Sequence, residues 1–165
     1  MELKDIPSGE QVFIDANIFV YHFTGASLEC KAFLKRCENG EIDGYTCAIV
    51  CAEVLHRLMC IEAISKGFIT PGNPVNKLKG QPNIVKMLID YQMHVSQIPT
   101  MGIQVIPIDN NLIHKSAIVR TQTGLLTNDS IIIAAMYKIG ITSLATNDYA
   151  FDGLPPIKFF KPTDV

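Results

Sequence analysis

The sequence contains no run of about 18 apolar residues without a charge, which is the shortest stretch that spans a membrane as a helix. Its first residues, Met1-Glu2-Leu3-Lys4-Asp5, are charged and lack the apolar core of a secretory signal peptide. We therefore expect a cytoplasmic protein that does not enter the membrane. The length of 165 residues corresponds to about one domain, so we expect a single domain over residues 1–165.

Paired cysteine motifs are also absent. Five cysteines occur, but none has the CxxC spacing of a zinc site. Cys47 and Cys51 are one helical turn apart, without a histidine or a second cysteine pair at a matching spacing. Buried free thiols in a reducing compartment are the ordinary interpretation.

An excess of positive charge is missing as well, because the formal net charge is -2. This value argues against a uniformly basic nucleic-acid binder. It does not exclude a nuclease, because acids that hold a metal count against the total while bound Mg²⁺ neutralises them.

The apolar pattern that is present alternates between strands and helices. Residues 12–14 form an apolar run without polar alternation, which predicts a strand buried on both faces, as in parallel sheets. Further strands are expected near residues 45–47, 103–108, 141–145 and 157–160, with helices between them. Helix caps are expected at Ser27, at Asp109 and at Thr127 or Asn128. This order predicts an α/β domain, a three-layer α/β/α sandwich with a mostly parallel central sheet.

One part of the chain departs from this alternation. The stretch 70–83 is rich in Pro and Gly and is expected to be a loop or a broken excursion. Residues 84–98 have helical periodicity and are expected to form a second long helix that pairs with the helix of residues 49–65. A helical-hairpin or loop excursion is therefore predicted near residues 61–100.

Four acids follow strands of the expected sheet: Asp15, Glu53, Asp129 and Asp148. In a parallel sheet these places lie at the carboxyl edge, where ligands bind. Like charges at short range destabilise a fold unless a cation offsets them, and oxygen-only ligands favour Mg²⁺ or Mn²⁺. The pattern thus predicts a divalent-metal site.

Each acid also has a structural interpretation, and the sequence leaves these alternatives open. Asp15 can cap a helix, and Glu53 can form a surface ion pair with Arg57. Asp129 can be a helix N-terminal acid that the dipole favours, and Asp148 can cap the turn that follows it.

The order of these motifs resembles that of PIN domains. In that family an apolar strand runs into Asp-x-Asn, as residues 12–17 do here, and a helix carries a glutamate, as at Glu53. Farther on, an acid opens an Ala-rich helix, as at Asp129, and a strand ends in Thr-x-Asp with a Phe shortly after, as at residues 146–151. The resemblance covers roughly residues 11–160.

The resemblance implies a metal-dependent endoribonuclease, most often seen in toxins of the VapC type. It assigns Asp15, Glu53, Asp129 and Asp148 as catalytic, metal-binding acids, with Mg²⁺ or Mn²⁺ as cofactor. Asn17 and Thr146 would support them or orient water. Many members carry a further acid two residues after the last aspartate, where this chain has Ala150; Asp152 is the nearest substitute.

The resemblance also implies partners. The substrate would be single-stranded or looped RNA, since no duplex-reading motif is present, and Arg57 and Arg120 are the favoured phosphate contacts. An antitoxin would inhibit a toxin of this kind, and the long helix pair would suit a homodimer.

Two other interpretations compete with the endoribonuclease. A Mg²⁺-dependent phosphatase or DNA nuclease could use similar acids, although the haloacid-dehalogenase type needs Asp-x-Asp where this chain has Asp15-Ala16-Asn17. The other is a non-catalytic PIN-like module that binds RNA or a partner, which Ala150 supports and the intact set of four acids opposes.

Overall fold

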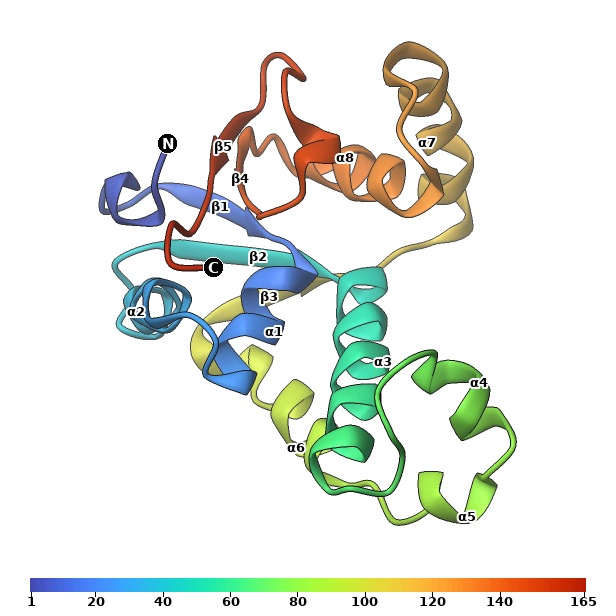
Figure 1. The fold of residues 1–165 in the computed structure, drawn as a ribbon. Coiled ribbons are helices and arrows are strands. Elements are labelled where there is room, and N and C mark those ends of the chain that lie inside the picture. Colours follow the sequence, from blue (N-terminus) through green and yellow to red (C-terminus); the bar gives the residue numbers. More distant parts are fainter.

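A central sheet of five parallel strands organises the computed structural model, which describes residues 1–165 (Figure 1). The strand order is β3-β2-β1-β4-β5. The strands are β1 (Gln11–Ile14), β2 (Asp43–Cys47), β3 (Ile103–Ile106), β4 (Ser143–Ala145) and β5 (Lys158–Phe160). The prediction of a mostly parallel sheet is confirmed, and every pairing is parallel.

Helices cover both faces of this sheet, as expected for a three-layer sandwich. The helices α1 (Ala16–Thr24) and α2 (Leu28–Glu38) lie on one side, and α7 (Asn110–Thr123) and α8 (Thr127–Ile139) lie on the other (Figure 1). The 18-residue helix α3 (Ala48–Ser65) starts directly after β2. None of the helices combines the length and the apolar character that crossing a membrane would require.

The apolar run in β1 is explained by its central place in the sheet. Phe13 pairs with Tyr45 of β2 on one side and with Leu144 of β4 on the other. Val12 and Ile14, like Phe13, have no exposed surface. A strand with neighbours on both edges and helices on both faces has no side that could carry polar residues.

Two of the helix caps expected from the sequence form, and one does not. The Ser27 hydroxyl accepts a hydrogen bond from the Cys30 amide, and the Asp109 carboxylate accepts one from the Leu112 amide. Both match the caps expected from the sequence. The cap expected at Thr127 or Asn128 is wrong, because α8 already starts at Thr127 and its N-cap residue makes no side-chain cap.

The distal half of α3 extends away from the sheet and carries an arm, defined here as residues 66–97 (Figure 1). The arm contains α4 (Pro74–Lys79), α5 (Pro82–Val85) and α6 (Asp90–Ser96). It packs on a small apolar cluster of its own: Cys60, Ala63, Ile69, Leu78 and Leu88.

One sequence prediction fails within the arm. The stretch 70–83 contains the short helix α4, as a broken excursion can, whereas the expected long helix over residues 84–98 is interrupted between α5 and α6. At the interruption the Glu62 carboxylate of α3 accepts hydrogen bonds from the backbone amides of Ile89 and Tyr91. Amides held by a side chain of another helix cannot take part in a continuous helix, which explains the break. The helix α6 still packs along α3.

Candidate metal-binding site

The site is built around Asp15, which follows β1 and is the N-cap residue of α1. Its Oδ1 accepts a hydrogen bond of 2.7 Å from the Ala16 amide, and its own backbone amide donates to the Ala145 carbonyl of β4. Only 6% of the residue is exposed. The end of the central strand therefore buries a carboxylate at the carboxyl edge of the sheet.

Two polar side chains fix the second oxygen of Asp15. Its Oδ2 accepts from the Thr146 hydroxyl at 2.7 Å and from the Asn17 amide nitrogen at 2.9 Å. The Thr146 oxygen in turn accepts the backbone amide of Asp148, and the Asn17 Oδ1 accepts that of Asn147. The loop after β4 is thus tied to the loop after β1, although more than 100 residues separate them in sequence.

The other three acids come from separate elements. Glu53 lies on α3, Asp129 is in the first turn of α8, and Asp148 is the N-cap residue of the short 3-10 helix η3 (Tyr149–Phe151). Asp148 is exposed, whereas Glu53 and Asp129 are half-buried.

Electrostatic coupling links these carboxylates. The pKa of Asp15 is raised to about 6, because burial and the charges of Glu53 and Asp148 outweigh the hydrogen bonds that lower it. Burial also raises the pKa of Asp129, again with help from Asp148 and Glu53. No hydrogen-bond donor faces the Asp129 carboxylate to offset this. The charges of Glu53 and Asp148 thus act on both Asp15 and Asp129.

The donor set fits a hard divalent cation in its chemistry, because it consists of carboxylate oxygens whose repulsion a cation would relieve. In the structure, no three His, Cys, Asp or Glu side chains are close enough together to hold an ion. The acids thus form a charged site without a closed ligand sphere.

The structural alternatives left open by the sequence are present too. Asp15 caps α1, and the Asp148 Oδ1 accepts the Ala150 amide of η3. The Arg57 Nη1 lies 3.5 Å from the Glu53 Oε1. These contacts do not explain why the charges of Glu53 and Asp148 act on both Asp15 and Asp129. Asp129 has no such structural partner.

Two further sequence candidates have other contacts in the structure. Asp152 pairs with Lys161 at 2.7 Å, so its charge is already balanced. The Arg120 Nη1 donates to the Ser116 and Ser130 hydroxyls and joins α7 to α8. A cavity of about 510 Å³ between these two helices contains none of the four acids among its lining residues.

Sequence reasoning missed one residue beside the site. Tyr149 directly follows Asp148 and is 74% exposed, and the Lys161 ammonium lies 4.1 Å from the centre of its ring. The available signal was an aromatic residue immediately after the last acid.

The fold and the site together define a parallel α/β domain with clustered carboxylates at its carboxyl edge. Residues 12–155 match the PIN domain, and the chain belongs to this family. A curated relative, ribonuclease VapC2 of Methanocaldococcus jannaschii, is 30% identical over 135 residues, which cover 78% of this chain and 80% of the relative.

Solved structures share the fold at lower identity. VapBC2 from Rickettsia felis, bound to a DNA fragment from their promoter, aligns with a TM-score of 0.57 at 15% identity and covers 92% of this chain and 98% of that one. A toxin-antitoxin complex from Klebsiella pneumoniae aligns with a TM-score of 0.57 at 19% identity. The alignment covers 89% of this chain and 95% of that one.

Replacement of Thr146 by Val is expected to lower metal-dependent activity by roughly 10- to 100-fold, because partners that orient a metal ligand typically matter to that extent. Valine keeps the shape but removes the donor to the Asp15 Oδ2. Thr46→Val is the matched control, since Thr46 is equally buried and donates to the Ile14 carbonyl instead. Equal activity losses in the two variants would contradict a specific role for Thr146.

Proposed function

We propose that this chain is a metal-dependent endoribonuclease that hydrolyses RNA phosphodiester bonds. The observation that carries the proposal is that the charges of Glu53 and Asp148 act on both Asp15 and Asp129, whose pKa values are raised by burial and by these charges. A 30% identical relative that is named a ribonuclease supports RNA as the substrate.

In this proposal Asp15, Asp129 and Asp148 hold Mg²⁺ or Mn²⁺, with Glu53 as a fourth acid. When bound, such an ion supplies charge stabilisation at the phosphate and makes water a stronger nucleophile. The Thr146 hydroxyl and the Asn17 amide hold the Asp15 carboxylate in one orientation. A carboxylate of the group accepts the proton of the attacking water, and the expected products carry a 5′-phosphate and a 3′-hydroxyl.

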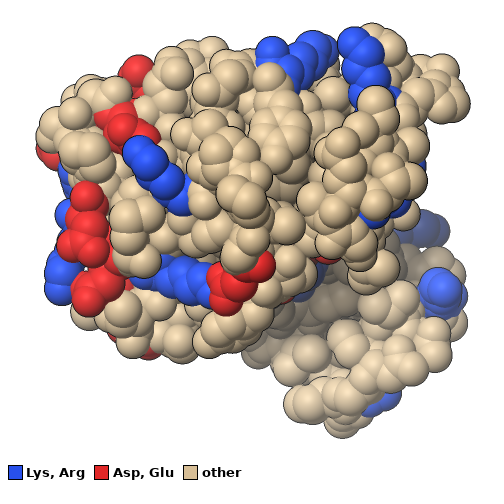
Figure 2. Space-filling view, turned by 90° about the horizontal axis from the view of Figure 1, so that it is seen from above, with Lys and Arg blue, Asp and Glu red and all other residues tan.

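Positive charge on the arm supports RNA binding. Residues 66–89 contain four lysines and no acid, although the whole chain has a net charge of -2. In Figure 2 Lys and Arg side chains (blue) are scattered over the arm, the lobe at the lower right, and Asp and Glu side chains (red) lie mostly on the opposite side. The Lys77 ammonium donates hydrogen bonds to oxygens of Thr70 and Pro71. The Lys66 ammonium pairs with the carboxylates of Glu62 and Asp90. Lys79 and Lys86 remain for contacts with phosphates.

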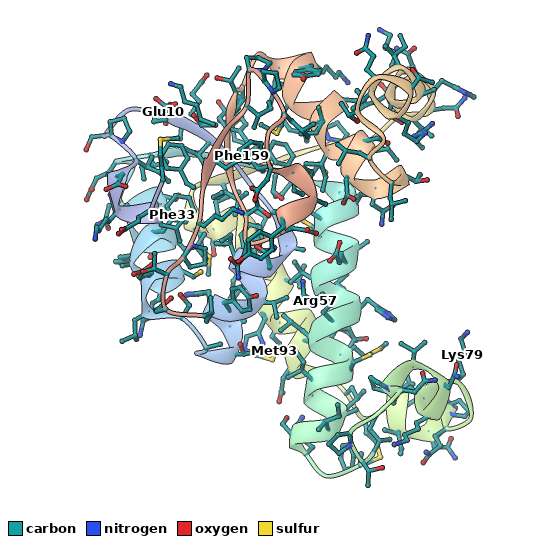
Figure 3. All side chains as sticks on the ribbon, turned by 45° about the horizontal axis from the view of Figure 1, so that its top comes forward. Glu10, Phe33, Arg57, Lys79, Met93 and Phe159 are labelled. Atoms are coloured by element: carbon teal, nitrogen blue, oxygen red, sulfur yellow. The ribbon has the colours of Figure 1, made fainter.

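The arginines are weaker candidates than these lysines. Arg57 is half-buried beside Glu53 on α3, whereas Lys79 lies far out on the arm (Figure 3). Arg120 is engaged by two serines.

The proposal extends to a toxin that an antitoxin holds inactive. The solved neighbours from Rickettsia felis and Klebsiella pneumoniae are described as VapBC2 and as a toxin-antitoxin complex, which supports a partner of this type. Met87, Ile89 and Met93 of the arm are more than half exposed and would suit either an antitoxin or a second copy of the chain. Co-purification with the product of a neighbouring small reading frame, and the mass in solution, would test these two partners.

The test of the enzymatic proposal is cleavage of a mixed pool of structured and single-stranded RNA, with Mg²⁺, with Mn²⁺ and with EDTA. Cutting that needs the metal and yields 5′-phosphate ends is the expected result. Failure to cut and failure to bind Mn²⁺ would instead favour the non-catalytic module. Cutting of DNA but not RNA would indicate a DNA nuclease.

A further inference from the structure

We propose that Tyr149 is a stacking platform for a base of single-stranded RNA next to the bond that is cut. This inference rests on the proposed endoribonuclease function and names a contact by which that site holds its substrate.

The exposure of Tyr149 is the first observation. At 74% it is by far the most exposed aromatic residue; Tyr137, at 46%, is the other large aromatic residue that is exposed. Such a ring contributes little to the core, because most of its surface stays in water. Aromatic side chains presented in this way bind unstacked bases, and they tolerate any sequence because every base has a π-face.

The second observation is that the ring is fixed. The Lys161 ammonium lies 4.1 Å from the ring centre on one face. Lys161 is itself anchored, since its Nζ pairs with Asp152 at 2.7 Å and its backbone bonds to Met1 and Leu3. A cation held over one face of an aromatic ring restrains it, and a base would stack on the face that the cation does not occupy.

The third observation is the position of the ring. Tyr149 directly follows Asp148, one of the four acids, and Asp148 caps η3 by accepting the Ala150 amide. The backbone that carries the ring is therefore oriented by the site itself. A base on this ring would belong to a nucleotide close to the phosphate at the carboxylates, and it must be unpaired for its face to be available.

The test measures RNA binding separately from cleavage. The probe is a random-sequence single-stranded RNA pool containing 2-aminopurine, bound in Mn²⁺ to protein that also carries Asp15→Asn. We expect Tyr149→Leu to weaken binding by roughly 5- to 100-fold and to remove the quenching of 2-aminopurine, whereas Tyr149→Phe keeps both. In the cleaving protein, Tyr149→Leu should raise KM more than it lowers kcat.

Tyr137→Leu is the matched control, because it removes an exposed tyrosine that lines the cavity between α7 and α8. Binding by this variant should equal that of the parent. Lys161→Met should give an intermediate loss, as expected of a residue that positions the ring.

The outcomes separate this inference from the proposed function. RNA cleavage by the wild type with unchanged binding by Tyr149→Leu would overturn the stacking role and leave the endoribonuclease intact. Binding that depends on Tyr149 without any cleavage would support the platform and contradict the enzyme. Absence of both binding and cleavage would contradict both, and equal losses in the Phe and Leu variants would assign the effect to the hydroxyl and overturn stacking.

Discussion

Replacement of Asp15 by Asn is expected to abolish cleavage, with a loss on the order of a thousandfold or more. The substitution removes one charge from the carboxylate set while keeping the side chain's size. A metal site that loses an anionic ligand loses several kcal/mol of charge stabilisation at the reacting phosphate, and each 1.36 kcal/mol is a factor of ten in rate. The measurement is RNA cleavage in Mn²⁺ and in Mg²⁺ beside the wild type.

The same variant is expected to be more stable in EDTA. The folded-state pKa of Asp15, about 6, exceeds its ordinary value of 3.8. The folded chain therefore holds this proton more tightly, and ionisation of Asp15 lowers the free energy of unfolding as the pH rises from about 4 to about 6. Asn carries no charge, so its advantage over the ionised acid should grow over that window.

Asp109→Asn is the matched control for this pair of effects. Asp109 is also an N-cap aspartate, but hydrogen bonding to the Leu112 amide and nearby lysines lower its pKa. Asn at that position should leave cleavage unchanged and bring no gain in stability. Full cleavage by Asp15→Asn would contradict the metal-site proposal, and a lower melting temperature than wild type at pH 7 would contradict the account of its buried charge.

Replacement of Glu62 by Ala is expected to have the largest effect on stability. Glu62 is 6% exposed and accepts hydrogen bonds from the Ile89 and Tyr91 amides and from the Lys66 ammonium. Burial alone would raise its pKa, but these donors outweigh burial and the pKa lies below its ordinary value. Loss of the acceptor leaves several donors unsatisfied, which costs about 2–4 kcal/mol.

The expected readout is a melting temperature lowered by roughly 6–12 °C. Amide hydrogen exchange should accelerate over α4–α6 and much less over the central sheet, because the arm has its own small core. Glu38→Ala serves as control, since Glu38 forms an exposed ion pair with Lys35 at 2.9 Å and such pairs contribute little. Similar destabilisation by both substitutions would show that Glu62 acts as an ordinary surface charge.

Local pattern was sufficient for most of the sheet and the helices that cover it. Several of these signals depend only on interactions with residues close in sequence. They are the apolar run before Asp15, the N-caps at Ser27 and Asp109, and the glycine at 140 that ends α8. Period and cap chemistry are properties of short segments, so the sequence displays them directly. The long helix expected over residues 84–98 was wrong because Glu62 of α3 holds the amides at the start of α6, a contact that no local pattern reveals.

Glu62 illustrates that limit. In the sequence Glu62 stands four residues before Lys66, which is the usual spacing of a surface ion pair on a helix. The spacing Val54, Leu58, Glu62 was the available signal that it lies on the buried face of α3. A buried glutamate needs several donors, and these come from residues 27 and 29 positions away.

The sequence by itself determined the alternation of strands and helices and the junctions at which four acids lie, because strand periodicity and parallel connections place such junctions at one edge. Only the tertiary structure decided how those acids are held. Hydrogen bonds from Thr146 and Asn17 orient the Asp15 carboxylate. Lys161 forms an ion pair with Asp152 and lies over one face of the Tyr149 ring. Arg120 donates hydrogen bonds that join α7 to α8. Hydrogen bonds and ion pairs between distant segments depend on packing at the ångström scale, which residue order does not specify locally.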